Sequence, residues 1–187
     1  MELRPLSSRD GTAWREVRRR NASWLQPWEA TSPSPADQAP TFGQMARRLR
    51  AQARKGEALP FVITYDGVLA GQVTVSGITW GSFCSATVGY WVDGALAGRG
   101  IMPAAVALIT DHCFGPVGLH RLEINIRPEN LASRRVVEKL GFREEGLRPR
   151  LLHINGRWAD HLAYALTVEE VPHGLHARWA SARASAP

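Results

Sequence analysis

A glycine-rich segment carries the clearest chemical signal in this sequence. Gly94, Gly98 and Gly100 follow an apolar stretch and precede a run of helical spacing that starts at Met102. Glycines let successive backbone N–H groups turn the same way without a Cβ clash. Such groups, together with the positive end of a helix, bind anions. The segment therefore predicts a binding site that suits a pyrophosphate.

Two common phosphate-binding motifs do not fit this segment. A Walker loop needs Gly-Lys-Ser/Thr after the glycines, and Arg99-Gly100-Ile101 lacks both the lysine and the hydroxyl. A dinucleotide-binding loop needs a third glycine three residues after the second, where Pro103 stands. On these residues alone, an ordinary tight turn between a strand and a helix remains the alternative interpretation.

The residues around this loop resemble a known family, the GCN5-related N-acetyltransferases (GNAT). Gly98-Arg99-Gly100, opening a helix, resembles their acetyl-CoA-binding motif, and residues 130–133 with 139–142 resemble their second CoA-binding helix. The Asn-x-x-Ser spacing and the Lys-Leu-Gly-Phe ending match the RimJ/RimL branch, as do residues 25–28 and 156–161. One departure is Ala95, where members often carry Gln or Arg. Only a side chain is lost there, so backbone binding of phosphate is not affected.

The resemblance implies that acetyl-CoA is the cosubstrate and that no metal takes part. The pantetheine arm would lie against the strand that ends near Val92, and the loop amides would hold the pyrophosphate. The amide of Asn130 would bind the arm, and Ser133 would lie near the sulfur. A plain helix N-cap is the alternative role of Asn130, and both roles can coexist. The expected cofactor-binding residues are Tyr90, Trp91, Val92, Leu96, Ala97, Gly98, Arg99, Gly100, Ile101, Asn130 and Ser133.

The chemistry that the resemblance implies is direct attack of a neutral amine on the thioester. Deprotonating an α-amino group at pH 7 costs about 1.2 kcal/mol, against roughly 4.6 kcal/mol for a lysine side chain. A backbone N–H near Val92 would stabilise the oxyanion. We therefore expect transfer of acetyl to an α-amino group, that of the N-terminal residue of a ribosomal or other protein, as in RimJ.

Glu123 and Ser133 are the expected catalytic residues. Ser133 or a tyrosine hydroxyl would protonate the leaving thiolate. Glu123 lies on the polar face of a predicted strand and is the first candidate for the general base, with Asp160 and His161 as alternatives. The alternative role of Glu123 is a salt bridge within the sheet, with Arg121 as its partner.

Three tryptophans and one carboxylate are the expected acceptor-binding residues: Trp24, Trp28, Trp158 and Asp160. The tryptophans would wall a cleft or simply pack against the sheet. Acetylation of a small amine, such as an aminoglycoside or a polyamine, is an alternative function, although cationic substrates prefer an acidic cleft. A non-catalytic CoA-binding module associated with the ribosome is a further alternative.

Charge and composition set limits on partners and location. The chain has 187 residues, 44% hydrophobic, with a net charge of +6. No apolar run approaches the roughly 20 residues of a membrane span, and the N-terminus shows no secretory signal. We expect a cytoplasmic monomer or homodimer with no membrane partner. Arginines cluster within residues 15–20 and 47–55. These clusters either contact rRNA or are simply solvated helix faces. Cys84 and Cys113 lack the neighbours of a zinc site.

The periodicity of the chain predicts the elements that must position these residues. Apolar alternation favours strands, and spacings of three and four favour helices. Residues 21–40 contain many prolines and read as a loop. The predicted strands are 2–6, 59–65, 68–80, 86–92, 120–127, 142–154 and 157–166, and the predicted helices are 8–20, 41–55, 102–114 and 130–140.

This order predicts a mixed α/β (α+β) fold in one domain, residues 1–170. The family resemblance implies a mostly antiparallel seven-stranded sheet flanked by helices. In it, strands 86–92 and 120–127 would be parallel, central and splayed apart. Residues 171–187 are expected to form a short C-terminal tail whose last ten residues are frayed.

Overall fold

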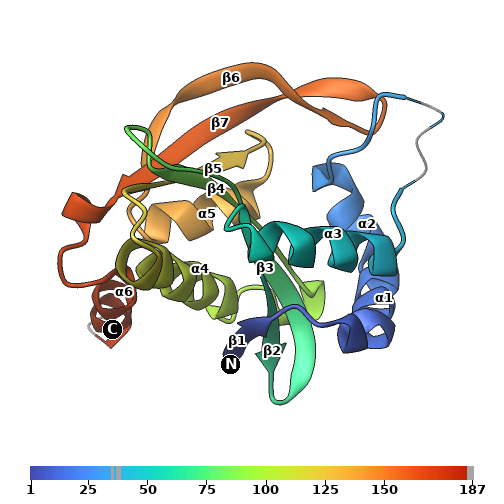
Figure 1. Cartoon of the computed structure of the whole chain (residues 1–187), viewed down its shortest axis with the longest axis horizontal. Helices are drawn as coiled ribbons and strands as arrows, with labels where there is room; N and C mark the ends of the chain where they lie inside the picture. Colours follow the sequence, from blue (N-terminus) through green and yellow to red (C-terminus); the bar gives the residue numbers. More distant parts are fainter. Residues whose placement is uncertain (35, 37–38, 185–187) are drawn as a thin grey trace.

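A seven-stranded sheet forms the centre of the molecule, and helices cover both of its faces (Figure 1). The computed structural model describes residues 1–34, 36 and 39–184. The strands are β1 (Glu2–Pro5), β2 (Ala58–Tyr65), β3 (Val68–Thr79), β4 (Ser85–Val92), β5 (Arg121–Ile126), β6 (Arg143–Ile154) and β7 (Arg157–Thr167). The α-helices are α1 (Gly11–Arg20), α2 (Ala22–Leu25), α3 (Phe42–Arg54), α4 (Ile101–His112), α5 (Leu131–Lys139) and α6 (Leu175–Ala184).

Shorter helical turns join several of these elements. Four are 3₁₀ turns, and η4, which extends α4, is a π-helical turn. They are η1 (Ser8–Asp10), η2 (Gln26–Trp28), η3 (Gly94–Leu96), η4 (Cys113–Val117) and η5 (Val168–Glu170).

The splayed centre of the sheet is the feature that matters for function. The strand order is β1-β2-β3-β4-β5-β7-β6, and every neighbouring pair is antiparallel except β4 and β5. Residues 85–87 of β4 pair with residues 121–123 of β5, and the pairing stops there. Both strands continue, so a wedge opens between them. This confirms the predicted mixed, mostly antiparallel sheet and its parallel central pair.

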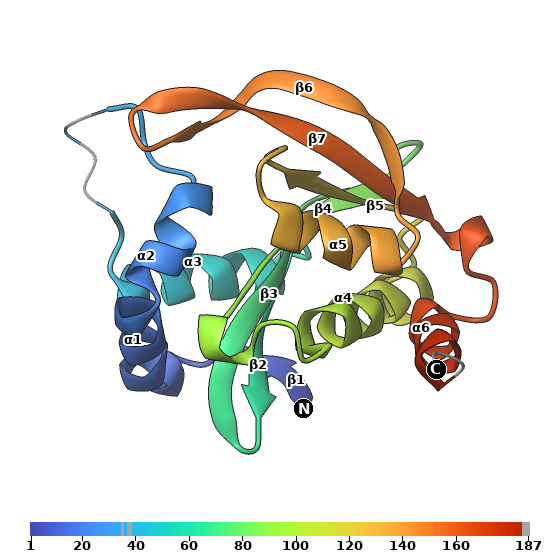
Figure 2. The same ribbon diagram turned by 180° about the vertical axis from the view of Figure 1, so that it is seen from behind.

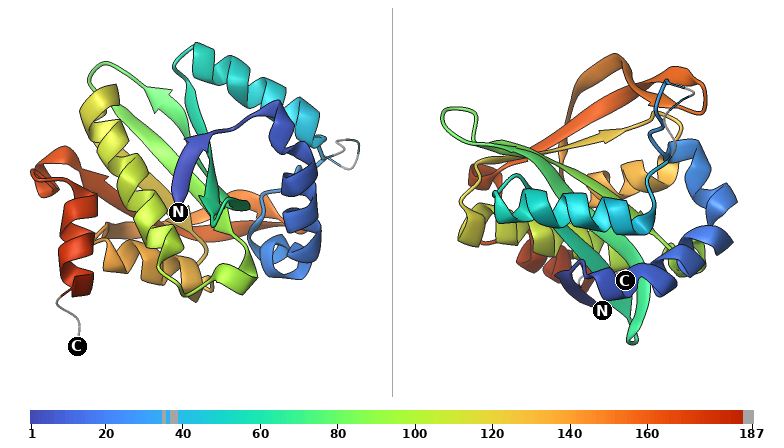
Figure 3. Two further views of the ribbon diagram at one scale, coloured as in Figure 1. Left: turned by 90° about the horizontal axis from the view of Figure 1, so that it is seen from below. Right: turned by 45° about the vertical axis from the view of Figure 1, so that its right-hand side comes forward.

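Two apolar clusters lie on opposite faces of the sheet, because successive side chains of a strand alternate. Ile63 packs in the cluster that includes α4 and α5, whereas its neighbour Val62 packs with α1 and α3. Figure 2 shows α4, α5 and α6 together on the first face, and Figure 3 shows α1 and α3 together on the second. The sheet is thus covered on both sides around the wedge.

Local sequence signals fix several boundaries as expected. Thr41 and Gln44 form a capping box at the start of α3, and the side chain of Asn130 caps α5. Asn155 and Gly156 have φ of 47° and 83°, as a type I′ turn between β6 and β7 requires.

The segment 21–40 differs from the loop that its prolines predict. Residues 22–28 are helical, in α2 and η2. Leu25 is only 5% exposed, so an apolar anchor holds this short helix where propensity alone would not. Residues 35, 37 and 38 lie outside the described part of the chain.

The C-terminal tail also differs from expectation, since most of it forms α6. Leu175 is fully buried and Trp179 packs at the edge of the same apolar cluster. The carboxylate of Asp111 in α4 accepts hydrogen bonds from the first amides of the helix. The prediction that the last ten residues are frayed was therefore wrong up to Ala184. Leu175 and Trp179 are four residues apart, so they lie on one face of the helix, and this face packs against the core. Residues 185–187 lie outside the described residues.

Candidate active site

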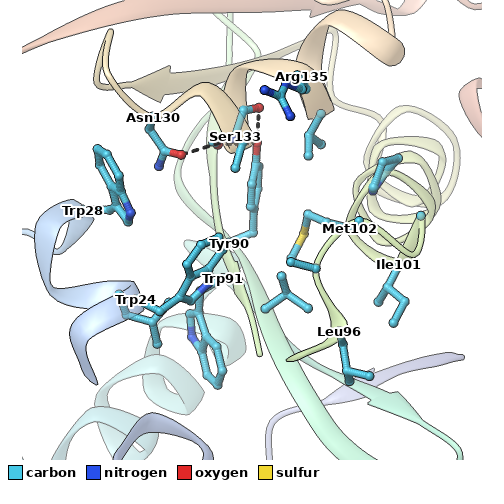
Figure 4. Close-up of a pocket in the computed structure, with 18 of the residues that line it drawn as sticks. Trp24, Trp28, Tyr90, Trp91, Leu96, Ile101, Met102, Asn130, Ser133 and Arg135 are labelled. Carbon is cyan, nitrogen blue, oxygen red and sulfur yellow. Dashed lines mark hydrogen bonds between the residues drawn. The ribbon is translucent and has the colours of Figure 1, made fainter. Parts of the chain in front are cut away.

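A cavity of about 310 Å³ opens where β4 separates from β5 (Figure 4). The end of β4, the glycine loop, the start of α4 and helix α5 form one side, and residues of α1, α2 and η2 with Glu29 form the other. The lining residues are Arg18, Trp24, Leu25, Trp28, Glu29, Tyr90, Trp91, Val92, Leu96, Ala97, Gly98, Gly100, Ile101, Met102, Pro103, Asn130, Ala132, Ser133, Arg135, Val136 and Lys139.

The structure brings most of the predicted site residues to this one cavity. Every residue expected to bind the cofactor lines it except Arg99. Trp24 and Trp28, expected to bind the acceptor, also line it, whereas Trp158 and Asp160 do not. Trp158 is 55% exposed on the β6–β7 hairpin, and Asp160 accepts a hydrogen bond from the amide of Arg150 in the same hairpin.

The glycine loop supplies unpaired donors at the start of α4. Gly98 and Gly100 both have φ of +81°, a conformation that side chains disfavour. In the described part of the chain, the N–H groups of residues 98–100 donate to no backbone acceptor. A Cβ built on Gly98 would meet nothing within 4 Å, so the loop presents open space beside these donors. A diphosphate fits this cradle.

A buried polar network holds the loop to α1. The Asp93 carboxylate is bound by Arg20 at 2.5 Å and by the side-chain amide of Asn21 at 2.9 Å. The Asn21 oxygen in turn accepts the N–H of Gly94 at 2.9 Å. Burial alone would raise the pKa of Asp93, but the hydrogen bonds from Arg20, Asn21 and the Ala95 amide outweigh burial and lower this pKa.

We expect Asp93→Ala to lower the free energy of unfolding by about 2 kcal/mol, since a charged hydrogen-bond acceptor only 4% exposed is lost. The KM for acetyl-CoA should also rise as the loop loosens. Because the folded-state pKa is depressed, the stabilisation is complete above the unfolded carboxyl pKa and is lost as pH falls through the folded value. Urea titrations at neutral and acid pH measure the free energy of unfolding of the wild type and the variant. Glu57→Ala, which removes an exposed carboxylate, is the control, and equal losses in both variants would contradict this role.

Tyr90 and Ser133 meet across the wedge. The Tyr90 hydroxyl lies 2.8 Å from Ser133 Oγ (Figure 4). Burial raises the pKa of the Tyr90 phenol well above its ordinary value, so this hydroxyl keeps its proton at neutral pH. Asn130 Oδ1 caps α5 by accepting the N–H of Ser133 at 3.1 Å, which leaves its NH₂ group available for a ligand. The capping role of Asn130 is therefore present, and ligand binding remains compatible with it.

The side of the cavity formed by α2 and η2 contains a pair of charges that the sequence analysis did not single out. Arg18 and Glu29 form an ion pair, and the Arg18 guanidinium lies 5.3 Å from the ring centre of Trp91. Burial lowers the pKa of Arg18. Glu29 is the one carboxylate among the lining residues that the structure describes. The signal that could have found Glu29 is its place directly after residues 25–28, the segment that resembles the family.

Glu123 lies outside the cavity, in an ion-pair network on the sheet. One carboxylate oxygen accepts from Arg121 at 3.0 Å and the other from Arg148 at 2.7 Å. The contacts of Glu123 therefore agree with its alternative role, a salt bridge within the sheet. His161 is 3% exposed and bonds the carbonyl of Ala159, and burial lowers its pKa. It does not line the cavity either.

Two kinds of feature are absent from the described residues. No group of three or more His, Cys, Asp and Glu side chains is placed to hold a metal ion there. Over the same residues, none of the helices has the length and apolarity to cross a membrane.

Comparisons with known proteins agree with this geometry. The family model described as the acetyltransferase (GNAT) domain matches residues 1–143. The probable N-acetyltransferase YjcK of Bacillus subtilis is 41% identical over 128 residues, 66% of this chain and 71% of the relative. The ribosomal protein uS5-alanine N-acetyltransferase of Escherichia coli is 28% identical over 86% of this chain and 85% of its own length.

A solved structure matches nearly the whole chain. The chain superposes on Mycobacterium smegmatis RimJ in complex with CoA-disulfide with a TM-score of 0.91 and 43% identity. The match covers 97% of this chain and 88% of the other.

Proposed function

The chain belongs to the GNAT acetyltransferase family and is an N-acetyltransferase, and from this premise we propose that it acetylates the N-terminal α-amino group of a ribosomal or other protein. One observation carries the proposal. A single cavity joins an amide-rich phosphate cradle to a pocket with two tryptophan walls and one carboxylate, Glu29. The similarity to RimJ and to the uS5-alanine enzyme supports this acceptor class.

Residues of this chain would hold the diphosphate and the pantetheine arm of acetyl-CoA, which when bound supplies the activated acetyl group. The N–H groups at Gly98 and Gly100 bind the diphosphate. Beyond Thr87, β4 has no partner on the β5 side, so its backbone groups in the wedge are free to bind the pantetheine arm and a carbonyl oxygen. The Tyr90 hydroxyl, polarised by Ser133, donates a proton to the departing thiolate.

The acceptor amine needs little help to lose its proton. The cost for an α-amine at pH 7 is about 1.2 kcal/mol, so a carboxylate of ordinary strength or a water molecule suffices. We propose that Glu29 attracts the ammonium form, orients it between Trp24 and Trp28, and accepts the proton directly or through water. The ion pair with Arg18 holds the Glu29 carboxylate in place.

We expect Glu29→Gln to lower kcat/KM for a peptide acceptor about tenfold while leaving the KM for acetyl-CoA unchanged, since one charge contact of roughly 1.4 kcal/mol is lost. Glu123→Gln is the matched control. It should leave the dependence of kcat on pH unchanged and lower only stability, because Arg148 loses its carboxylate partner and Arg121 keeps only Glu145. If Glu123→Gln lost turnover while Glu29→Gln stayed active, the general base would instead be assigned to Glu123.

The acceptor class is tested with peptides and small amines side by side. A library of peptides that differ in the first residue is incubated with acetyl-CoA, and the products are read by mass spectrometry. We expect acetylation of α-amines, with kcat/KM rising towards pH 8 as the free amine forms. Acetylation of polyamines or aminoglycosides but no peptide would favour the small-amine function. CoA binding without turnover of any acceptor would favour a non-catalytic module.

A further inference from the structure

The C-terminal helix ends at the phosphate cradle. Nη1 of Arg183 lies 2.9 Å from the point that a Cβ on Gly100 would occupy, and an edge atom of the Trp179 ring lies 3.6 Å from it. The Arg183 guanidinium stacks on that indole, 5.2 Å from the ring centre. Gly100 lines the cavity and is the N-cap of α4. A cation from α6 therefore stands against the loop where we place a diphosphate.

Helix α6 is held firmly enough to position this cation. It lies beside α4 (Figure 2), and its first two amides donate to the Asp111 carboxylate at 2.6 and 3.0 Å. Further along, the Arg178 guanidinium donates to the carbonyl of Leu140, just after α5. The helix thus connects α4 with the end of α5.

Several cations on the α4 and α5 side of the cavity differ from Arg18, which pairs with Glu29, and from most arginines of the nearby sheet, because among the described residues they have no carboxylate partner. Arg121, Arg143 and Arg148 in the strands all form ion pairs with glutamates. In the described part of the chain, four cations near the cavity form none: Arg99, Arg135, Lys139 and Arg183. Unpaired cationic side chains around a loop with free amides suit a ligand with several negative charges.

We propose that Arg183, braced on the Trp179 ring, binds a phosphate group of CoA beside Gly100. The inference rests on the proposed function, and it adds a binding residue from beyond residue 143, where the family match ends. Stacking limits the rotamers of Arg183, so less side-chain entropy is lost when it contacts phosphate. CoA carries a diphosphate and a 3′-phosphate, and both offer this chemistry.

The test is isothermal titration of the whole protein with three ligands: CoA, 3′-dephospho-CoA and pantetheine. Arg183→Met should weaken CoA binding fivefold to tenfold and leave pantetheine binding unchanged. Arg54→Met is the matched control, because Arg54 is exposed on α3, away from the cavity, and its loss changes the net charge equally. The control should bind all three ligands as the wild type does.

The second ligand identifies which phosphate is bound. If Arg183→Met loses as much affinity for dephospho-CoA as for CoA, Arg183 binds the diphosphate. If it loses affinity for CoA but not for dephospho-CoA, Arg183 binds the 3′-phosphate. If the wild type binds CoA and Arg183→Met loses no more affinity for CoA than Arg54→Met does, this inference alone is overturned. An equal loss of affinity for pantetheine in Arg183→Met would also overturn the inference, because pantetheine has no phosphate. Failure of the wild type to bind CoA would overturn the proposed function as well.

Discussion

Gly98→Val is expected to weaken CoA binding by about 100-fold or more, with only a modest loss of stability. The Cβ at this position points into open space beside the free amides, so the valine side chain would occupy the diphosphate site. Loss of two charge-assisted hydrogen bonds at about 1.5 kcal/mol each corresponds to roughly that factor. Titration calorimetry with CoA measures the affinity, and thermal unfolding measures the stability.

Gly118→Val separates occlusion from backbone strain. Gly118 has the same φ of +81° and the same open surroundings, but it follows η4 and does not line the cavity. Both variants force valine into the left-handed region, at a cost of about 1–2 kcal/mol. Only Gly98→Val should lose CoA. If Gly98→Val bound CoA within a few-fold of the wild type, the loop would not be the diphosphate site.

Tyr90→Phe is expected to lower kcat about 100-fold while changing the KM for acetyl-CoA only a few-fold. The substitution removes one hydroxyl, which lies 2.8 Å from Ser133 Oγ, and leaves the ring in place. Proton donation by a positioned group contributes roughly 10²–10⁴-fold to a rate. Because the phenol has a raised pKa, its ionisation should not limit the wild-type rate at any pH below about 10. Steady-state kinetics with the best peptide from the library measures these values.

Tyr65→Phe is the control, because Tyr65 ends β2 and does not line the cavity. It should retain full activity. The double variant Tyr90→Phe with Ser133→Ala should be little slower than Tyr90→Phe alone, since the two hydroxyls act as one unit. Full kcat in Tyr90→Phe would remove this tyrosine from the mechanism and leave Ser133 as the donor.

The parts of the site that the sequence determined are those that depend on neighbours along the chain. The glycines at 98 and 100, the cap at Asn130 and the turn at 155–156 are each set by backbone geometry within a few residues. The alternation of Leu122 and its neighbours likewise predicted which face of β5 is buried. These local rules predicted the glycine loop at the start of α4, whereas the parallel, splayed strands around the wedge were implied only by the resemblance to the family.

Only the tertiary structure decided which charged and aromatic side chains share the cavity. Glu123 was the first candidate base in the sequence, yet two arginines bind it on the sheet, while Glu29, which the sequence analysis did not single out, lines the cavity beside Arg18. Trp24 reaches the cavity because Leu25 anchors a helix in a proline-rich segment, whereas Trp158 remains exposed. Likewise, α6 forms because Leu175 finds an apolar surface on α4, and Arg183 thereby reaches Gly100. Contacts between residues far apart in the chain depend on packing, and no local pattern encodes them.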